Sequence, residues 1–260
     1  MTRPAVLISG SAKGIGRATA QRFAAEGYLV GIYDVDDQGV VQALNELGDC
    51  AVGGHLDVTK PGDWKKALAA FTKASGGRLD ILINNAGILR SGPFHEVPLA
   101  AHHLTMDINV GGVINGAYAA YPYLKATPGS QVVNLCSASA IYGQPDIASY
   151  SASKFAVRGL TEALELEWRG EDIRVQAVWP LWVNTGLLDD NHASSTETLG
   201  VNLTVDDVAN EIWKVTRPRG RVGLPRVHTA VGFPAKFLAT GASVVPNFVS
   251  REINKRLSKR

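Results

Sequence analysis

The pair of residues best suited to proton transfer in this sequence is Tyr150 and Lys154. They lie four residues apart in a stretch of helical pattern, Ser149–Trp168, which places both side chains on one helix face. A free tyrosine ionises at about pH 10, and a nearby ammonium group favours the phenolate. We therefore expect Lys154 to bring the pKa of Tyr150 closer to neutral pH, as a general acid or base requires. The alternative is an ordinary Tyr–Lys pair on a surface helix.

A serine that could assist this pair follows the predicted strand Gln131–Leu135. The hydroxyl of Ser137 could hold a substrate oxygen on which charge develops, as an oxyanion hole does. Ser139 is a nearby competitor for this role, and Cys136 suits a buried strand end better than a nucleophile. The sequence contains no Gly-x-Ser-x-Gly motif, and its histidines lack partners at metal-ligand spacing. Hydrolase chemistry and a metal site are therefore not expected.

The elements that must position these residues alternate regularly along the chain. Short apolar, β-rich segments are separated by stretches of helical period, which is typical of parallel strands joined by crossover helices. The predicted fold class is α/β, with a doubly wound parallel sheet between two helical layers. The predicted strands are Ala5–Ser9, Leu29–Tyr33, Ala51–Leu56, Leu79–Ile83, Gln131–Leu135, Arg174–Val178 and, as a seventh, Arg221–Leu224.

The organisation of the chain changes after Thr216, where proline and arginine become frequent. We predict a single domain over residues 1–225 and a C-terminal extension over residues 226–260. The apolar stretch Val231–Val249 is not expected to cross a membrane, because Pro234 and Pro246 interrupt it and a span needs about 20 apolar residues.

Composition and charge restrict the class of protein further. A chain of 260 residues that is 45% hydrophobic can bury a sizeable core, and two cysteines without a leader segment favour a reducing, cytoplasmic location. Residues 1–216 carry a net charge of −7, whereas residues 217–260 carry +9. No aromatic-basic pattern accompanies this basic end, so we expect no nucleic-acid partner; a solvated end is the simpler interpretation of its charge.

A glycine-rich loop joins the first predicted strand to the first helix. Glycine permits a tight turn and a close approach of the backbone to a pyrophosphate, and the helix that follows directs its N–H groups and positive dipole end at the same anion. The position of this loop, between a strand and a helix, makes the motif more specific than glycine spacing alone. The residues expected to bind a dinucleotide here are Gly10, Ser11, Lys13, Gly14, Ile15 and Gly16.

The end of the second strand bears on the choice between NAD and NADP. Asp34 can accept hydrogen bonds from the adenosine ribose hydroxyls, and it would repel the 2′-phosphate of NADP. Lys13 would attract that phosphate, so the two residues disagree. We give Asp34 the greater weight and expect NAD, with NADP less favoured. The neighbouring Asp36 and Asp37 are consistent with a helix cap.

Two further strand ends carry candidate cofactor contacts. Open α/β sheets bind ligands at the carboxyl ends of their strands, and both segments follow predicted strands. Asp57 could accept a hydrogen bond from the adenine amino group, while small residues would let the backbone pack beside the adenosine. Asn84 and Asn85 are equally suited to form a turn. The residues expected at this part of the cofactor are Asp57, Val58, Asn85, Ala86 and Gly87.

Taken together, the motifs from Val6 to Leu188 resemble the short-chain dehydrogenase/reductase family in its single-domain form. The matching pieces, in order, are Gly10 to Gly16, Asp57-Val58, Asn84 to Gly87, Asn109, Ser137 and Tyr150-Ser151-Ala152-Ser153-Lys154. The resemblance implies a Rossmann fold, a homodimer or homotetramer, and an NAD(P)-dependent enzyme that moves hydride between a nicotinamide and a carbonyl/alcohol pair. An epimerase on the same fold and a non-catalytic dinucleotide sensor are the alternatives.

The resemblance also implies roles for individual residues. Asn109, Ser137, Tyr150 and Lys154 match the catalytic tetrad of the family, in which the asparagine holds a water and the lysine binds the nicotinamide ribose. An Asn that disturbs its helix locally would leave a carbonyl for that water. Pro180, Val183 and Thr185 match the segment that holds the carboxamide. Leu181 stands where the family usually has glycine, so a positive φ is not expected there.

The open end of the sheet is expected to bind an uncharged, lipophilic alcohol or ketone, such as a steroid, retinoid or fatty alcohol. The side chains predicted around it are apolar or aromatic, and no Arg or Lys is placed to clamp an acidic group. Several of these residues could equally close the core beneath a loop. Besides Ser137, the predicted substrate contacts are Ile141, Tyr142, Trp182, Leu187 and Leu188.

The C-terminal end departs most from the family pattern. Phe248, Val249, Ile253 and Leu257 fall mostly on one face of a predicted helix whose remaining positions are largely basic. We expect this helix to cover the substrate site or a partner subunit. Peripheral contact with an anionic membrane is the alternative, and it would suit a lipophilic substrate.

Overall fold

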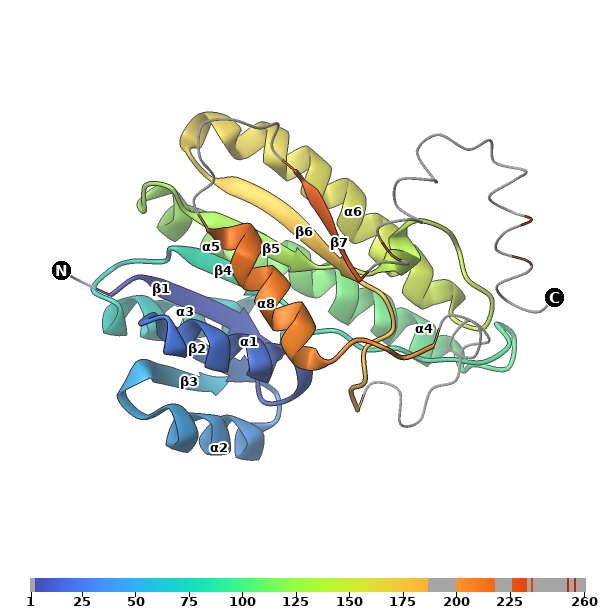
Figure 1. Ribbon diagram of the computed structural model, residues 1–260, viewed down its shortest axis with the longest axis horizontal. Helices are drawn as coiled ribbons and strands as arrows, with labels where there is room; N and C mark the ends of the chain where they lie inside the picture. Colours follow the sequence, from blue (N-terminus) through green and yellow to red (C-terminus); the bar gives the residue numbers. More distant parts are fainter. Residues whose placement is uncertain are drawn as a thin grey trace.

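A single twisted sheet with helices on both faces forms the molecule, as Figure 1 shows. The structure, a computed structural model, describes residues 3–186, 200–217, 226–232, 235, 252 and 255. Its seven parallel strands are arranged in the order β3-β2-β1-β4-β5-β6-β7. This arrangement confirms the predicted α/β class and the doubly wound parallel sheet.

The first six strands form close to where the apolar segments predicted them. The strands are β1 (Ala5–Ser9), β2 (Leu29–Asp34), β3 (Ala51–His55), β4 (Ile81–Asn84), β5 (Gln131–Leu135), β6 (Arg174–Pro180) and β7 (His228–Val231). The labelled helices are α1 (Gly14–Ala25), α2 (Asp37–Leu47), α3 (Pro61–Ala74), α4 (Leu99–Met106), α5 (Gly112–Lys125), α6 (Ala148–Trp168) and α8 (Val205–Thr216).

The seventh strand forms later in the chain than we predicted. β7 pairs with β6, with His228 opposite Ala177 and Val231 opposite Pro180, whereas the segment Arg221–Leu224 lies outside the described residues. β7 is at the edge of the sheet, and of its residues only Val231 is fully buried, which explains its weak apolar pattern. The boundary that we placed at residue 225 therefore precedes the last strand of the sheet.

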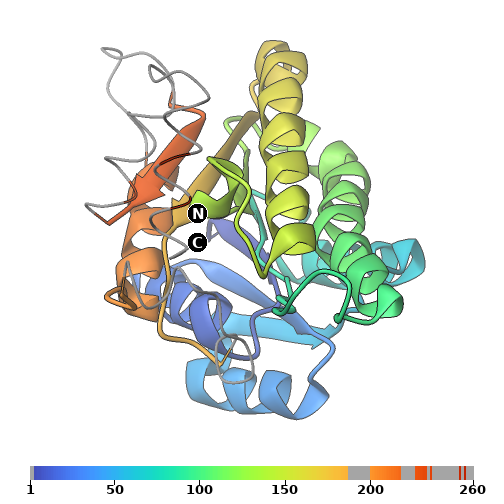
Figure 2. The ribbon, with the colours of Figure 1, turned by 90° about the vertical axis from the view of Figure 1, so that its right-hand side faces the viewer.

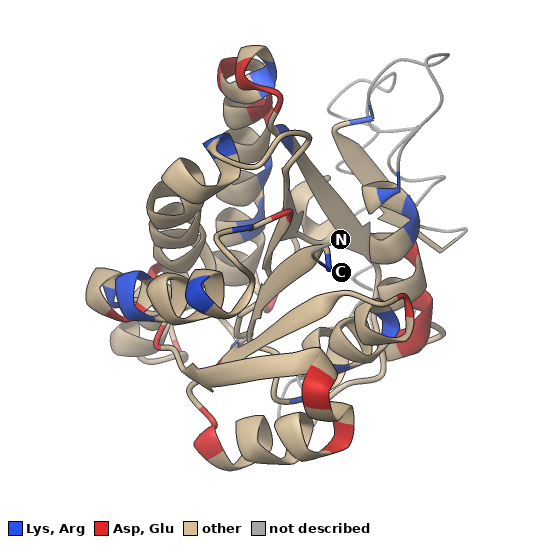
Figure 3. Ribbon diagram, turned by 90° about the vertical axis from the view of Figure 1, so that its left-hand side faces the viewer, with Lys and Arg blue, Asp and Glu red and all other residues tan. Residues whose placement is uncertain are grey.

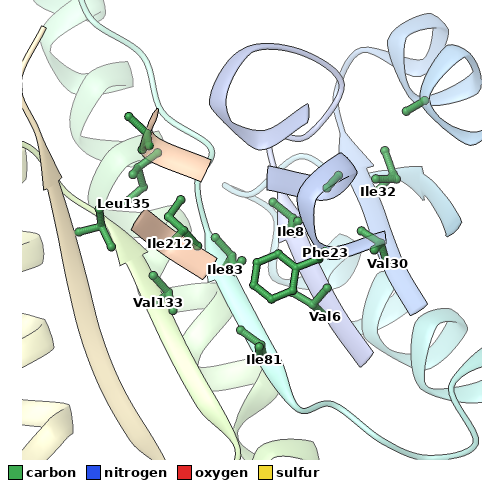
Figure 4. Close-up of a cluster of buried hydrophobic side chains, with 14 of the residues drawn as sticks. Val6, Ile8, Phe23, Val30, Ile32, Ile81, Ile83, Val133, Leu135 and Ile212 are labelled. Atoms are coloured by element: carbon green, nitrogen blue, oxygen red, sulfur yellow. The ribbon is translucent and has the colours of Figure 1, made fainter. Parts of the chain in front are cut away.

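Alternate residues of the central strands enter two separate cores. Val6 and Ile8 of β1 pack with Phe23 of α1 and Ile212 of α8, as the close-up in Figure 4 shows. Leu7, which lies between them, faces the opposite core beneath α3 and α5. A strand buried on both faces must be apolar at nearly every position. This is why these segments read as continuous apolar runs.

The two helical layers are visible in Figure 2, where α5 and α6 cover one face of the sheet and α1 and α8 cover the other. α1 and α8 also contact each other, because Phe23 and Trp213 meet edge to face with ring centroids 5.2 Å apart. Figure 3 shows that Lys, Arg, Asp and Glu residues lie mainly on the helices and loops, while most of each strand carries other residue types. The sheet is thus a rigid apolar platform for the loops at its ends.

The order of the strands determines where a ligand can bind. The chain runs outward from β1 to β2 and β3, and then returns to β4 on the other side of β1. The loops after β1 and β4 therefore diverge at the carboxyl edge, and such a switch point opens a crevice in doubly wound sheets. The expected nucleotide-binding motifs follow these two strands.

Most of the C-terminal extension lies outside the described residues, including Phe248, Val249, Ile253 and Leu257. The predicted basic helix and its contacts therefore stay a prediction. Within the part of the chain that the structure describes, no helix is long and apolar enough to cross a membrane.

Candidate active site

A cavity of about 510 Å³ opens at the switch point of the sheet. Its wall is formed by the segments that follow β1, β2, β3, β4, β5 and β6, together with the start of α6. The predicted site residues that line it are Gly10, Lys13, Gly14, Ile15, Asp34, Asp57, Val58, Asn85, Ala86, Gly87, Ser137, Tyr150, Lys154, Pro180, Trp182, Val183 and Thr185. The fold thus gathers most of the expected cofactor and catalytic residues around one space.

The glycine loop is held tightly against the segment after β4. Gly10 has a φ of +66°, and a Cβ atom there would lie 2.6 Å from the Cα atom of Ala86. The Asn85 side chain donates hydrogen bonds to the carbonyl oxygens of Ser9, at 2.9 Å, and Gly10, at 2.6 Å. A side chain at position 10 would therefore both strain the backbone and push the two loops apart.

The first turn of α1 faces the cavity without a side-chain cap. The helix begins at Gly14, and Lys13 at the N-cap position makes no capping hydrogen bond. The first N–H groups of an α-helix have no partner within the helix, so they and the helix dipole can stabilise an anion. This end of the cavity is therefore suited to a phosphate group.

Two residues of the predicted loop motif do not line the cavity. Ser11 is fully buried, and its hydroxyl donates to the carbonyl oxygen of Ile8 at 2.8 Å and accepts from the backbone N–H of Tyr33 at 2.9 Å. Gly16 lies inside the turn, because a Cβ atom there would be 2.2 Å from the carbonyl oxygen of Gly10. Both residues shape the loop from behind, in contrast to the direct contact that we expected.

Asp34 is positioned at the edge of the cavity by two backbone donors. Its Oδ2 atom accepts from the N–H of Ala12 at 3.0 Å, and its Oδ1 atom accepts from the N–H of Asp36 at 3.1 Å. The carboxylate is therefore fixed in place, and each oxygen has a further lone pair for a ligand hydroxyl. Asp36 in turn caps α2 by accepting from the N–H of Gly39, as predicted for this pair of acidic residues.

The segment after β3 presents Asp57 to the same cavity. Its Oδ1 atom accepts hydrogen bonds from the backbone N–H and the hydroxyl of Thr59, at 2.9 and 2.7 Å. Partial burial acts to raise the pKa of Asp57, but the bonds from Thr59 outweigh it and the pKa is lowered. Asp57 is therefore a carboxylate, an acceptor only, at neutral pH.

The catalytic candidates converge from two elements. Ser137 follows β5, and Tyr150 and Lys154 lie one turn apart near the start of α6. Ser137 lies close enough to Tyr150 that its hydroxyl acts to lower the pKa of the phenol. The Nζ atom of Lys154 is 5.4 Å from the centre of the Tyr150 ring and donates to the carbonyl oxygen of Leu135 at 2.9 Å. This geometry gathers two hydroxyls and an ammonium group on one side of the cavity.

The pKa of Tyr150 differs from what the Tyr–Lys spacing predicted. We expected Lys154 to bring it toward neutrality, but burial raises the pKa of Tyr150 to about 12, with a smaller opposing effect of the Ser137 hydrogen bond. Burial also lowers the pKa of Lys154. The physical reason is that both groups are removed from water, and the ammonium is bonded to a strand carbonyl below the ring.

Asn109 lies beneath the cavity in an irregular turn between α4 and α5. The segment Asp107–Gly111 is a π-helical turn, which is the local helix disturbance that we expected around this residue. The Asn109 side chain accepts from the N–H of Ile88 at 2.8 Å, and donates to the carbonyl oxygen of Ile88 at 2.9 Å and to the Ser153 hydroxyl at 3.1 Å. Asn109 therefore ties the loop after β4 to α6.

The segment after β6 closes the cavity opposite the glycine loop. Pro180, Val183 and Thr185 line it, and Val183 forms an isolated bridge to Leu203 that holds the segment in place. Leu181, where the family has glycine, is not among the non-glycine residues with positive φ in the described part of the chain, as expected. The backbone path therefore does not require glycine at position 181.

The predicted substrate contacts are only partly brought to the cavity. Trp182 lines it, whereas Ile141 and Tyr142, which follow the short helical turn Ala138–Ala140, do not. Ile141 packs against a separate apolar cluster with Val157 and Trp179. Leu187 and Leu188 lie outside the described residues.

Sequence reasoning missed one polar residue of the cavity. Gln144 is 5% exposed, lines the cavity and donates from Nε2 to the Ser139 hydroxyl at 3.0 Å. No local motif marks a glutamine in an irregular segment, and only its position six residues before Tyr150 could have indicated it.

The model of the short chain dehydrogenase family matches residues 4–195. A 3-alpha-(or 20-beta)-hydroxysteroid dehydrogenase of Mycobacterium tuberculosis is 36% identical over 183 residues, 70% of this chain and 70% of that protein. A 2,5-dichloro-2,5-cyclohexadiene-1,4-diol dehydrogenase of Sphingobium indicum is also 36% identical, over 69% of this chain and 72% of that protein.

A solved structure gives the same picture at the level of the whole fold. A 3-ketoacyl-(acyl-carrier-protein) reductase from Brucella melitensis, complexed with NADH, superimposes with a TM-score of 0.81. It is 29% identical and covers 88% of this chain and 96% of its own. The predicted family and enzyme class, an NAD(P)-dependent dehydrogenase or reductase, are thus confirmed: the chain belongs to the short-chain dehydrogenase family.

Proposed function

We propose that this short-chain dehydrogenase interconverts an uncharged, lipophilic secondary alcohol and its ketone, and that it uses NAD in preference to NADP. The observation that carries the proposal is the placement of Ser137, Tyr150 and Lys154 in one cavity with the glycine loop and Asp34. A dinucleotide site and a proton donor for a substrate oxygen are the two parts that this reaction requires.

The residues around the cavity fit a dinucleotide. Gly10 lets the loop pass Ala86 where a Cβ atom would clash, and the uncapped start of α1 offers N–H groups to a pyrophosphate. Asp34 would accept hydrogen bonds from the ribose hydroxyls, and the negative charge of Asp34 disfavours a 2′-phosphate. Asp57 would lie near the adenine. Lys13 on the same wall is the opposing influence. Because Asp34 is held by two backbone N–H groups, we expect its effect to dominate.

The chain's own residues would handle the substrate oxygen and its proton. Ser137 and Tyr150 hold that oxygen between their hydroxyls, and Tyr150 gives or takes the proton there. Lys154 would bind the nicotinamide ribose, and the π-helical turn at Asn109 would leave a carbonyl for a water that connects Lys154 to solvent. Bound NAD supplies the chemistry that no side chain offers, which is hydride transfer at carbon.

A lipophilic substrate is favoured by the lining of the cavity around Tyr150. Leu181 and Trp182 line the cavity beside Tyr150. Behind them, Leu89 and Ile147 complete a small buried apolar cluster. The hydroxysteroid substrate named for the Mycobacterium tuberculosis relative is of the same chemical class. Lys154 is the basic side chain nearest this cluster in the described lining, and the proposed reaction already uses it.

We also propose that the chain forms a homo-oligomer through α5 and α6. Ile114 and Tyr118 lie one turn apart on α5 and are 47% and 84% exposed, and Phe155 and Leu166 of α6 are 40% and 69% exposed. Exposed apolar side chains on two neighbouring helices are typical of a protein interface. Light scattering coupled to size exclusion would test this, because replacement of Tyr118 and Leu166 by charged residues should yield monomers.

The experiment that tests the reaction is a panel of alcohols and ketones assayed with NAD and with NADP through the absorbance of the reduced cofactor. Steroids, retinoids and fatty alcohols represent the proposed class, and sugar alcohols and hydroxy acids serve as the contrast. We expect turnover of the lipophilic members, with the higher kcat/KM for NAD. Preference for hydroxy acids, or for NADP, would contradict the corresponding part of the proposal.

A further inference from the structure

We propose that Gln144 is a positioning residue that acts through Ser139 to direct the hydroxyl proton of Ser137 toward the substrate oxygen. This inference rests on the proposed dehydrogenase reaction and adds a residue to the set that controls it. Gln144 does not need to touch the substrate for this role.

The three side chains form a buried row along the wall of the cavity. Ser137, Ser139 and Gln144 are 8%, 2% and 5% exposed, and all three line the cavity beside Tyr150. The Ser137 and Ser139 hydroxyl oxygens are 3.2 Å apart, and Gln144 Nε2 donates to the Ser139 oxygen at 3.0 Å. Gln144 itself is anchored, because its backbone N–H donates to the Ser151 hydroxyl on α6 at 3.1 Å.

Ser137 has a single proton, and two groups compete for it. Its oxygen already accepts the backbone N–H of Ser139 at 3.1 Å, which leaves one lone pair and the proton. In the pair of hydroxyls either oxygen can be the donor. If Ser137 donates to Ser139, its proton is lost to the substrate oxygen. If Ser139 donates to Ser137, the second lone pair of Ser137 is filled and its proton can point to Tyr150 or the substrate.

Gln144 favours the second orientation because an amide N–H can only donate. With Gln144 and Ser137 both donating to Ser139, the proton of Ser139 would need a third acceptor. Among the described residues, the hydrogen bonds of the Ser139 hydroxyl are those with the Ser137 hydroxyl and the Gln144 amide. A buried hydroxyl proton without an acceptor is costly, so Ser139 donates to Ser137. Donation by Gln144 to the same oxygen also strengthens that donor.

Replacement of the amide by a carboxylate should reverse this row of bonds. In Gln144→Glu the side chain keeps its shape but becomes an acceptor, and a carboxylate attracts the Ser139 proton more strongly than a hydroxyl does. Ser139 would then accept from Ser137, and the Ser137 proton would no longer point to the substrate. Gln144→Met removes the donor without adding an acceptor, so it should have a smaller effect in the same direction.

The test measures kcat and KM for ketone reduction in Gln144→Glu, Gln144→Met, Ser139→Ala and the double variant Ser139→Ala with Gln144→Glu. We expect kcat to fall at least tenfold in Gln144→Glu, with little change in KM. This fall in kcat should stay below the roughly 10²- to 10³-fold loss that is typical when an oxyanion donor is removed. In the Ser139→Ala background, which leaves the Ser137 proton without a competing acceptor, Gln144→Glu should change kcat by less than about twofold. Gln42→Glu, on the exposed surface of α2, is the matched control for the added charge.

The outcomes separate this inference from the proposed function. Turnover by the wild-type protein tests the function, and without it both proposals fail. If wild-type turnover is present but Gln144→Glu equals Gln42→Glu, the inference alone is overturned. A loss that persists undiminished in the Ser139→Ala background would overturn it too, because Gln144 would then act on the substrate directly. Thermal unfolding and cofactor binding of each variant identify any loss of folding. If Gln144→Glu does not fold, the kcat of Gln144→Met tests the inference in its place.

Discussion

Lys154 donates a hydrogen bond from its Nζ atom to the carbonyl oxygen of Leu135, 2.9 Å away. The bond ties the ammonium group of α6 to the end of β5, two residues before Ser137, and leaves it 5.4 Å from the centre of the Tyr150 ring. Burial lowers the pKa of this lysine and raises that of Tyr150 to about 12. The two groups therefore share an environment that disfavours charge, which makes each sensitive to any charge bound in the cavity.

Tyr150→Phe tests the role of the phenol. The change keeps the ring, and so the packing against Leu89 and Trp182, but removes the hydroxyl that meets Ser137. We expect kcat to fall by at least about 10²-fold, the usual contribution of a general acid or base, with cofactor affinity unchanged within about twofold. Tyr28→Phe is the matched control, because that ring packs against Trp213 and does not line the cavity. Turnover near that of the control would remove Tyr150 from the mechanism.

The two directions of the reaction should depend on pH differently. Ketone reduction needs the phenol of Tyr150, and alcohol oxidation needs the phenolate. With a pKa raised to about 12 by burial, the phenol predominates at neutral pH. Reduction should therefore be level from about pH 6 to about pH 9, while kcat for oxidation rises with pH. A bound positive charge would shift that rise to lower pH. An oxidation rate that falls with increasing pH would contradict this assignment.

The sequence could indicate which predicted residues come together around one cavity, because their placement depends on elements with strong patterns. Short β-rich runs such as Ala5–Ser9 and Gln131–Leu135 indicate buried strands, and the residues that follow parallel strands meet at one edge of the sheet. The i, i+4 relation of Tyr150 and Lys154 likewise follows from helix geometry. Each of these predictions required only local pattern and the topology of parallel strands.

The failures depend on features that no local pattern encodes. The pKa of Tyr150 is governed by burial, which tertiary packing creates. Ser11 turns inward because Ile8 and Tyr33, distant from each other in sequence, offer it backbone partners. Tyr142 does not line the cavity, whereas Gln144, two residues later in the same irregular segment, does. Side-chain direction in an irregular segment is decided by such contacts, and residue type does not reveal it.

Asp34→Arg tests the basis of cofactor preference. The guanidinium would replace repulsion of a 2′-phosphate by a paired charge, so kcat/KM should shift toward NADP by at least about tenfold. The change also removes the acceptor of the Ala12 and Asp36 N–H groups, and we expect a loss of about 2 kcal/mol in unfolding free energy. Asp34→Asn keeps an acceptor and removes only the charge, so its shift should be smaller. If the unmodified protein already prefers NADP, then Lys13 outweighs Asp34.

Tyr142→Phe should make the protein more stable. The Tyr142 hydroxyl is buried and has no hydrogen-bond partner among the described residues, and burial raises its pKa to about 12. An unpaired buried hydroxyl costs about 1 kcal/mol or more, and phenylalanine fills the same space without it. We therefore expect an increase of about 1 kcal/mol in the free energy of unfolding at neutral pH, measured by chemical denaturation.

Tyr33→Phe is the matched comparison, because burial raises the pKa of Tyr33 to the same value of about 12, but its hydroxyl donates to the carbonyl oxygen of Ala67 at 3.1 Å. Loss of this hydroxyl should therefore lower the free energy of unfolding by about 1 kcal/mol, whereas Tyr142→Phe should raise it.

The two variants should show the same change in the pH dependence of stability. A tyrosine whose folded pKa lies above its unfolded value of about 10 adds no pH dependence below that pH, but it lowers the stability of the fold as pH rises from about 10 to about 12. Each variant should accordingly lose less stability than the wild type between about pH 9 and about pH 11. Equal destabilisation by Tyr142→Phe and Tyr33→Phe at neutral pH would mean that the Tyr142 hydroxyl has a partner.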